Sequence, residues 1–380
     1  MNGNERIEFL EAIINSYAID EEKGIYKEYA PPKTEDIPYA YLFSQFGLTG
    51  MLYFAVKSGL EVKKQYKSAL DGLNYYRSMP YDDDSIKYHS ERGENYNGGH
   101  ATCFFDDNIW VARNNLFAYE IFGKKEYLLE AQRITRYIYK GWDEELGGLV
   151  WNELGLTPKG SEQDLERGLS ANACCIIVNS LLYQITGEES YLNWAKKFYK
   201  FCKRMQDPVT KVYYNGVHTI VEDAKKHSGA INKDLYAYNS GSMILADILL
   251  HEITNDDNYL QDAIACAHAT HKAFLVDKED NLKYYDGFNW FTAILIEGYQ
   301  ALVEYPKTPD SDRELVLSYM DMVKEGLTYS FDNFKSEYGL LPHDYTIGWR
   351  DNEPEETKVF DRLFLTQTGL AEMVFLTADK

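Results

Sequence analysis

Two adjacent carboxylates, Asp106 and Asp107, are the residues of this sequence best suited to chemistry. They lie in the segment CFFDDNIWVARNNLF, residues 103–117, directly before an expected helix. A carboxylate at a helix N-terminus can act as an N-cap, which explains one aspartate but not a second one flanked by Phe104 and Trp110. Burying two adjacent acids among aromatic rings raises at least one carboxyl pKa through desolvation and like charge. General-acid catalysis needs such a raised pKa.

The expected geometry of this pair is also informative. Adjacent side chains diverge, yet at a helix start two carboxyl groups can lie about 5–5.5 Å apart, the separation used by retaining glycosidases. Asp256-Asp257 is a weaker pair, because the same repeat position holds Lys124-Lys125 elsewhere and is therefore typical of a solvated turn. His268 and His271 lack a third ligand at metal-binding spacing. We expect neither a metal nor a cofactor.

A repeat predicts the elements that position the aspartates. EIFGKKEYLLEA (120–131), QITGEESYLNWA (184–195) and EITNDDNYLQDA (252–263) align without gaps, and Tyr127, Tyr191 and Tyr259 share one position in them. Tyr66 belongs to a weaker copy. Repeats of this length indicate a stacked supersecondary unit.

Each unit is predicted to be a helical hairpin. Apolar helices are expected at Asn108–Phe122, Ala171–Ile185 and Tyr238–Ile253, each followed by a short polar turn and an amphipathic helix such as Tyr191–Met205. No sustained strand alternation is visible. Six hairpins of about 64 residues each would fill the chain. We therefore predict an all-α (α/α)6 barrel, formed by residues 1–380 as a single domain.

Four segments between the repeats are rich in glycine, aromatic residues and acids. They are GWDEELGGLVWNE (141–153), KVYYNGVH (211–218), NLKYYDGFNWF (281–291) and YGLLPHDYTIGW (338–349). In a barrel these segments converge on one face, where they would form the walls of a binding cleft. Asp286 and Trp290 of the third segment are predicted to bind substrate.

Composition limits the partners of the chain. The 380 residues include 60 acidic and 39 basic ones, giving a formal charge of −21. This charge argues against nucleic acid, an anionic membrane surface or a polyanionic substrate. The 32 tyrosines, 18 phenylalanines and six tryptophans suit both a packed scaffold and the stacking of sugar rings. A neutral partner is therefore expected.

The cysteines and the N-terminal segment say little about compartment. Five cysteines without disulfide or zinc spacing are expected to be buried and reduced. The first residues do not read as a signal peptide, and no apolar run is judged long enough for a membrane helix. We expect a cytoplasmic protein if the chain is full length, and a secreted or periplasmic one if a leader was removed.

The segment FFDDNIW resembles the consecutive Asp-Asp motif of glycoside hydrolase family 76, the endo-α-1,6-mannanases. GWDEELGGLVWNE, LLYQITGEESYLNWA and the YNSG at 238–241 are similar to further motifs of this family, and the resemblance runs from about residue 40 to the C-terminal helix. It implies an (α/α)6 barrel. It also implies a retaining hydrolase that cleaves α-1,6-mannosidic linkages in a neutral oligo- or polysaccharide, α-mannan.

The resemblance also implies roles for individual residues. Asp106 would be the nucleophile and Asp107 the acid/base. The positions that match motif residues facing or supporting the sugar cleft are Trp142, Asp143, Trp151, Asn152, Tyr238 and Asn239.

Two other kinds of function stay open from the residues alone. One is another (α/α)6 sugar enzyme, of the unsaturated glucuronyl hydrolase or epimerase type. The other is a non-catalytic glycan-binding barrel, against which the intact aspartate pair counts.

Overall fold

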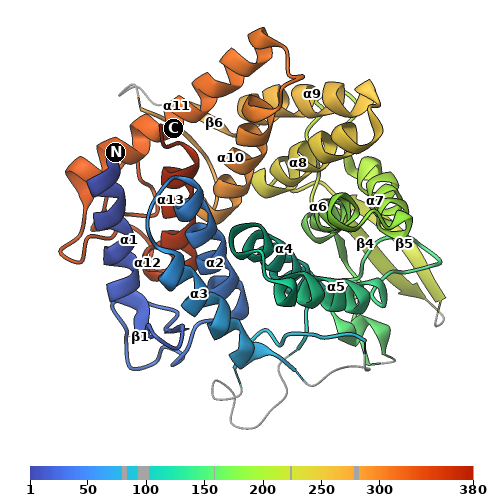
Figure 1. Ribbon diagram of the computed structural model, residues 1–380, viewed down its shortest axis with the longest axis horizontal. Coiled ribbons are helices and arrows are strands. Elements are labelled where there is room, and N and C mark those ends of the chain that lie inside the picture. The colour runs from blue at the N-terminus through green and yellow to red at the C-terminus, as the bar shows by residue number, and fades with distance from the viewer. Residues whose placement is uncertain (79–83, 93–101, 158, 223–224, 278–281, 380) are drawn as a thin grey trace.

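The computed structural model describes all residues except 79–83, 93–101, 158, 223–224, 278–281 and 380 (Figure 1). Within the described residues, six apolar helices form an inner layer. They are buried around most of their circumference, as expected for helices that are apolar on every side. These helices are α2 (Leu42–Lys57), α4 (Phe105–Phe122), α6 (Leu169–Thr186), α8 (Ala237–Thr254), α10 (Asn289–Glu304) and α13 (Phe364–Leu376).

The inner helices form a closed ring. In chain order each packs against the next, and α13 packs against α2, so that the last inner helix meets the first. An outer helix covers each of them, and Figure 1 shows this second layer around the first. The outer helices are α1 (Gly3–Tyr17), α3 (Lys63–Gly72), α5 (Lys125–Tyr139), α7 (Glu189–Cys202), α9 (Asp257–Phe274) and α11 (Asp310–Phe334). The predicted (α/α)6 barrel is confirmed.

One of the six helix pairs is not contiguous in sequence. The first five inner helices pair with the outer helix that follows them, whereas α13 pairs with α1 from the other end of the chain. The Tyr17 hydroxyl donates a hydrogen bond of 2.9 Å to the carbonyl of Arg362, and the Tyr17 ring stacks on Phe364 at 4.6 Å. The barrel is thus closed by contacts between its two ends.

The repeat forms the short turns at one end of the barrel. Gly123, Gly187 and Asn255 end α4, α6 and α8 in the left-handed conformation that suits glycine and asparagine. Asp256 caps α9 by accepting a hydrogen bond from the Asn258 backbone N–H, and Asp257 is the first residue of that helix. Both side chains are exposed, as expected for a solvated position. The four repeat tyrosines lie on outer helices and are buried or half-buried.

The connections at the opposite end contain strands that the sequence analysis did not predict. The longest pair forms a hairpin, whose mostly exposed second strand lacks the apolar alternation that signals a strand. The strands are β1 (Ala18–Asp20), β2 (Ile25–Tyr26), β3 (Arg167–Gly168), β4 (Gly216–Glu222), β5 (Lys225–Asn232), β6 (Leu275–Asp277) and β7 (Lys283–Tyr285). β1 pairs with β2, β4 lies between β3 and β5, and β6 pairs with β7, all antiparallel. A short helix, α12 (Glu355–Arg362), precedes α13.

The cysteines and the apolar helix α6 lie mostly in the interior of the barrel. All five cysteines are buried and free, as expected. The judgement that no apolar run is long enough for a membrane helix needs correction, because α6 has the length and composition to cross a membrane. In the barrel α6 is a mostly buried inner helix, and such core helices commonly have this composition.

Candidate active site

A pocket of about 420 Å³ lies at the end of the barrel where the inner helices begin. Its lining comes from the N-terminal ends of α2, α4, α8, α10 and α13 and from α12. These residues are Phe43, Phe46, Asp106, Asp107, Trp110, Tyr238, Phe288, Trp290, Phe291, Phe360, Leu363 and Leu365. Sequence segments far apart along the chain therefore build one cavity.

Both aspartates belong to the first turn of α4. The helix begins at Phe105, three residues earlier than predicted, and its N-cap is Phe104, whose side chain has no atom that could cap. Neither aspartate is the N-cap, so the capping explanation fails for both. Both residues are half-buried as a whole, and their carboxyl groups lie at the positive end of the α4 dipole, where negative charge is stabilised.

The environment separates the pKa values of the two carboxyl groups. Burial raises the pKa of Asp106 to about 6, and hydrogen bonding by Trp110 opposes this rise. Oδ1 of Asp106 is buried without a hydrogen-bond partner among the described residues. Burial raises the pKa of Asp107 well above its usual range, and the neighbouring charge of Asp106 adds to this effect. Near neutral pH one carboxyl can therefore be ionised while the other holds a proton.

The start of α4 is fixed by hydrogen bonds to the strand-like segment around Tyr88. Asn108 accepts from the Tyr88 backbone N–H at 2.7 Å and donates through Nδ2 to the Tyr88 carbonyl at 2.9 Å. It also donates to the Phe104 carbonyl at 2.7 Å. Because Asn108 directly follows Asp107, these bonds restrict the orientation of the helical turn that carries both carboxyl groups.

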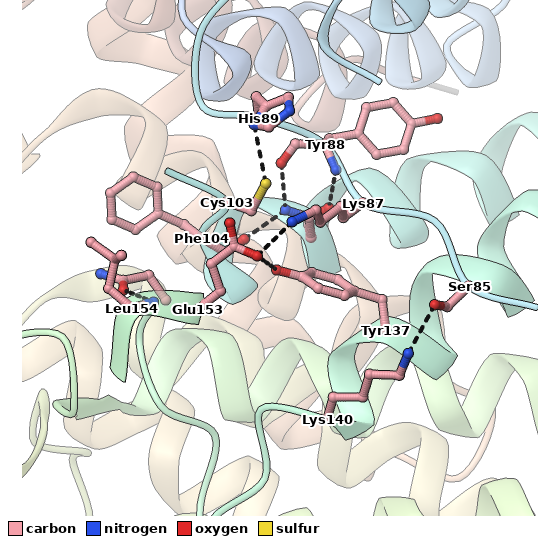
Figure 2. A network of polar contacts seen from close by, with 12 residues as sticks. Ser85, Lys87, Tyr88, His89, Cys103, Phe104, Tyr137, Lys140, Glu153 and Leu154 are labelled. Carbon is pink, nitrogen blue, oxygen red and sulfur yellow. Dashed lines mark hydrogen bonds and ion pairs between the residues drawn. The ribbon is translucent and has the colours of Figure 1, made fainter. Parts of the chain in front are cut away.

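A second set of contacts holds the segment before α4 against the connection between α5 and α6. Figure 2 shows Lys87 pairing with Glu153 at 2.7 Å and the Cys103 sulfur 3.2 Å from Nδ1 of His89. The Glu153 backbone N–H donates to the Cys103 carbonyl at 3.2 Å. The Phe105 backbone N–H donates to the Trp151 carbonyl at 2.9 Å. Hydrogen bonds therefore hold the backbone before the aspartate pair, at Cys103 and Phe105, and the side chain directly after it, at Asn108.

Tyr238 and Trp290 lie in the pocket with the two aspartates. The Tyr238 ring stacks on Phe291 with the centroids 4.1 Å apart, and burial raises the pKa of its hydroxyl. Trp290 packs edge-on against Trp110 at 5.0 Å. Four of the residues predicted for the site are thus brought together.

Trp142 and Asp143 are placed elsewhere. The Trp142 ring packs edge-on against Phe198 of α7 at 5.1 Å, so it contributes to the outer layer and not to the pocket wall. Asp143 accepts hydrogen bonds from the backbone N–H groups of Glu145 and Leu146 at 2.9 and 3.0 Å. Burial alone would raise the pKa of Asp143, but these bonds and Lys226, 3.3 Å away, lower it. Asp143 stabilises a turn.

The remaining predicted residues are not among those that line the pocket. The Trp151 ring lies 4.8 Å from that of Phe104. Asn152 accepts from the Leu154 N–H and donates to Asp164 at 2.7 Å, which fixes its loop. Asn239 is fully buried in the first turn of α8. Asp286 is exposed in the connection before α10.

The sequence analysis missed most of the apolar wall. These residues are Phe43, Phe46, Phe288, Phe291, Phe360, Leu363 and Leu365. The signal that would have found most of them is position, because most lie in or directly before the first turn of an inner helix. An apolar residue there is otherwise indistinguishable from a core residue.

A second cavity, of about 410 Å³, lies where the inner helices end. Its lining is mainly aliphatic and aromatic, and two of its acids have partners. Glu297 is 2.7 Å from Arg113, and Glu120 is bound by the Tyr53 hydroxyl and by Lys57, each at 2.7 Å. The chemistry of the first pocket, two carboxyls with separated pKa values, is not reproduced by these paired acids.

Within the described residues no group of three or more His, Cys, Asp or Glu side chains could hold a metal ion. The expected absence of metal and cofactor remains a prediction.

The sequence profile of Glycosyl hydrolase family 76 matches residues 63–330. No curated protein matches the chain in sequence.

Several solved structures share the fold. One is the family 76 mannosidase Bt3792 from Bacteroides thetaiotaomicron, with a TM-score of 0.79 and 22% identity over 98% of this chain and 96% of the other. Another is an α-1,6-mannanase from a Salegentibacter species, with a TM-score of 0.73 and 20% identity over 99% and 98%. An inactive variant of that mannanase, in which two consecutive aspartates are replaced by asparagine, is bound to α-1,6-mannotriose. Its TM-score is 0.72, with 20% identity over 99% of both chains.

Proposed function

Because this chain belongs to glycosyl hydrolase family 76, we propose that it is a retaining α-1,6-mannanase with Asp106 as nucleophile and Asp107 as acid/base. The observation that carries the proposal is the adjacent carboxyl pair at the pocket floor, with one pKa near 6 and the other well raised. The consecutive aspartates replaced in the inactive mannanase variant support the same assignment.

The first step uses both carboxyl groups in their favoured states. The ionised Asp106 attacks the anomeric carbon of mannose while Asp107 donates its proton to the departing glycosidic oxygen. The bond between the anomeric carbon and that oxygen breaks, and a covalent mannosyl ester forms on Asp106. Once Asp107 has lost its proton, it can act as a base.

The second step restores the enzyme. Asp107 accepts a proton from a water molecule that attacks the anomeric carbon, and the ester bond to Asp106 breaks. Two successive inversions give net retention of the α configuration. One water molecule is consumed for each linkage cleaved.

The test is to incubate the protein with linear α-1,6-mannan and measure released reducing ends. Asp106→Ala and Asp107→Ala should each abolish release while thermal melting shows a folded protein. Asp71→Ala is the matched control, because Asp71 is exposed on the outer helix α3 and paired with Lys67. Undiminished release by either pocket variant would refute the assignment.

An activated substrate separates the two roles. In an aryl α-mannoside made from a very acidic phenol, the phenolate can leave without being protonated. Asp107→Ala should therefore still form the mannosyl ester and release a burst of phenol. Asp106→Ala should give no burst. NMR of the first product formed should show the α anomer, and the β anomer would contradict a retaining mechanism. Binding of mannan without turnover would indicate a glycan-binding barrel instead.

A further inference from the structure

The aromatic segment 338–349, predicted to form a wall of the binding cleft, does not line the pocket that holds the two aspartates, here called the catalytic pocket. Tyr338 and Trp349 of this segment instead line a separate pocket of about 350 Å³, the outer pocket, together with Asp361 and Arg362 of α12. This volume is in the range of small-ligand sites. The chemistry proposed above assigns no role to the outer pocket.

The two aromatic side chains of the outer pocket are exposed. Trp349 is 45% exposed and Tyr338 is 52% exposed. The Trp349 indole N–H donates a hydrogen bond to the Phe334 carbonyl at the end of α11. Gly348, directly before Trp349, has a φ of 75°, and a Cβ there would lie 2.9 Å from the Phe334 ring, so the backbone at this turn is closely packed. Folding therefore fixes the Trp349 ring without burying it, which is typical of a binding surface.

The polar side chains of the outer pocket are also held in place. Nε and Nη2 of Arg362 donate hydrogen bonds of 3.0 and 2.8 Å to the carbonyl of Pro31, which lines the same pocket. Asp361 is buried, and its carboxyl group accepts a hydrogen bond from the His343 backbone N–H. A carboxyl group has further acceptor sites, so Asp361 can still accept a hydrogen bond from a ligand hydroxyl. Groups that are fixed before binding lose little entropy when a ligand arrives.

This combination of side chains fits a neutral sugar. One face of a pyranose ring presents C–H groups, which pack favourably on the negatively polarised face of an aromatic ring. The hydroxyl groups at the edge of the sugar can donate hydrogen bonds to a carboxyl group. Glu337 and Asp361 outnumber Arg362 in the lining, so the pocket disfavours a polyanion.

Helix α12 separates the outer pocket from the catalytic pocket. Phe360 and Leu363 line the catalytic pocket, whereas Asp361 and Arg362, which lie between them in sequence, line the outer pocket. Residues three apart share a helix face, so the two pairs point to different sides of the helix end. An α-helix with its side chains is about 10–12 Å across. A chain of several sugars can span that distance, whereas a single mannose cannot.

We propose that the outer pocket binds a distal part of the same mannan chain whose linkage is cleaved in the catalytic pocket. Tyr338 and Trp349 stack on sugar rings, and Asp361 accepts a hydrogen bond from a sugar hydroxyl. Once a chain is held at one pocket, binding at the other is intramolecular, which raises the affinity for long chains without changing the chemistry. This inference rests on the proposed function, which supplies the substrate.

The kinetic test compares a long substrate with a short one. In Trp349→Ala and in Tyr338→Ala, the ratio of kcat/KM for linear α-1,6-mannan to kcat/KM for an aryl α-mannoside should fall about fivefold or more. The fall should come from a higher KM for mannan, because the outer pocket does not touch the reacting atoms. The aryl α-mannoside carries one sugar and cannot reach across α12.

Tyr329→Ala is the matched control for these variants. Tyr329 is also exposed and packs edge-on against Phe334 at 5.4 Å, yet it lines neither pocket. Its replacement should leave the ratio at the wild-type value. An unchanged ratio in both aromatic variants of the outer pocket, or the same fall in Tyr329→Ala, would overturn the inference.

A binding measurement keeps the inference and the proposed function separable. The NMR signal of the Trp349 indole N–H, identified by its loss in Trp349→Phe, is followed while α-1,6-mannohexaose is added to a variant in which Asp106 and Asp107 are both replaced by asparagine. A shift of this signal that methyl α-mannoside does not reproduce supports the outer pocket even if the wild-type protein cleaves no mannan, in which case only the proposed function fails. Cleavage of mannan by the wild-type protein without such a shift refutes the inference and leaves the proposed function intact.

Discussion

Replacing Trp110 with phenylalanine should move the acidic limb of the pH–activity profile to higher pH. Trp110 is 1% exposed, and its hydrogen bonding lowers the pKa of Asp106 against the effect of burial, leaving that pKa at about 6. A hydrogen bond to a charged group contributes about 1.5–3 kcal/mol, and one pKa unit corresponds to about 1.4 kcal/mol. Phenylalanine keeps an aromatic ring at this position but is smaller and lacks the N–H. The pKa of Asp106 should therefore rise by about one to two units.

The direction follows from the role of Asp106. A nucleophile must be ionised, so activity is lost as the pH falls through the pKa of Asp106, near 6 in the wild-type protein. In Trp110→Phe this loss should begin at a higher pH. The measurement is kcat/KM on an aryl α-mannoside from about pH 4 to about pH 9, because this parameter reports the free enzyme.

Trp142→Phe is the matched control. Trp142 packs against α7 outside the pocket, so its replacement should leave the acidic limb in place. An acidic limb that stays at the wild-type position in Trp110→Phe, or moves to lower pH, would refute the reasoning. A shift of the alkaline limb instead would reverse the roles of the two aspartates.

Three further predictions concern groups around the site and in the core. Asp106→Asn should lower the pKa of Asp107, because the charge of Asp106 contributes to raising that pKa. A carboxyl NMR titration measures the pKa of Asp107, and an unchanged value would show that the two groups do not interact. Glu372 is fully buried, and burial raises its pKa to about 8. Its protonated form contributes fully to the free energy of unfolding below about pH 4.5, and this contribution is lost as the pH rises to about 8. Urea unfolding should therefore show Glu372→Gln gaining up to about 4 kcal/mol over the wild type between pH 5 and pH 8, whereas a pH-independent difference would contradict the assigned pKa. Gly148→Ala should lower the melting temperature more than Gly147→Ala. Both glycines have positive φ, but a Cβ at Gly148 would lie 2.4 Å from the Phe201 ring, whereas a Cβ at Gly147 would lie 3.7 Å from it. Equal losses in melting temperature would show that φ alone matters.

The sequence predicts those features of the molecule that depend on local pattern. Helical hairpins recur because the Y-L-x-x-A repeat places apolar residues at helical spacing. Gly123, Gly187 and Asn255 end the inner helices α4, α6 and α8 through their own backbone preference. The aspartate pair is conspicuous because two acids among aromatic residues violate the apolar pattern. Such violations are expected at functional sites.

Features that depend on long-range packing could not be predicted in this way. Phe43 and Phe360 line one pocket only because the ring of inner helices closes, and nothing in either local sequence indicates the other. Trp142 lies in a segment that resembles a family motif, yet its ring packs against α7 and outside the pocket. The strand β5 is mostly exposed and is held by hydrogen bonds to β4, which leave no apolar alternation in the sequence.

The pairing of α1 with α13 has a consequence for how the protein is made. The Tyr17 hydroxyl and its acceptor at Arg362 are 345 residues apart. At ribosomal rates of about 5–20 residues per second, that interval takes about 20 to 70 s, far longer than a helix needs to form. During translation the apolar face of α1, including Phe9 and Ile13, therefore remains unpaired until α13 has been synthesised. Nascent chains should depend most on chaperones in this interval. Moving α1 to the C-terminal end of the chain, so that it is synthesised after the rest of the barrel, should reduce that dependence.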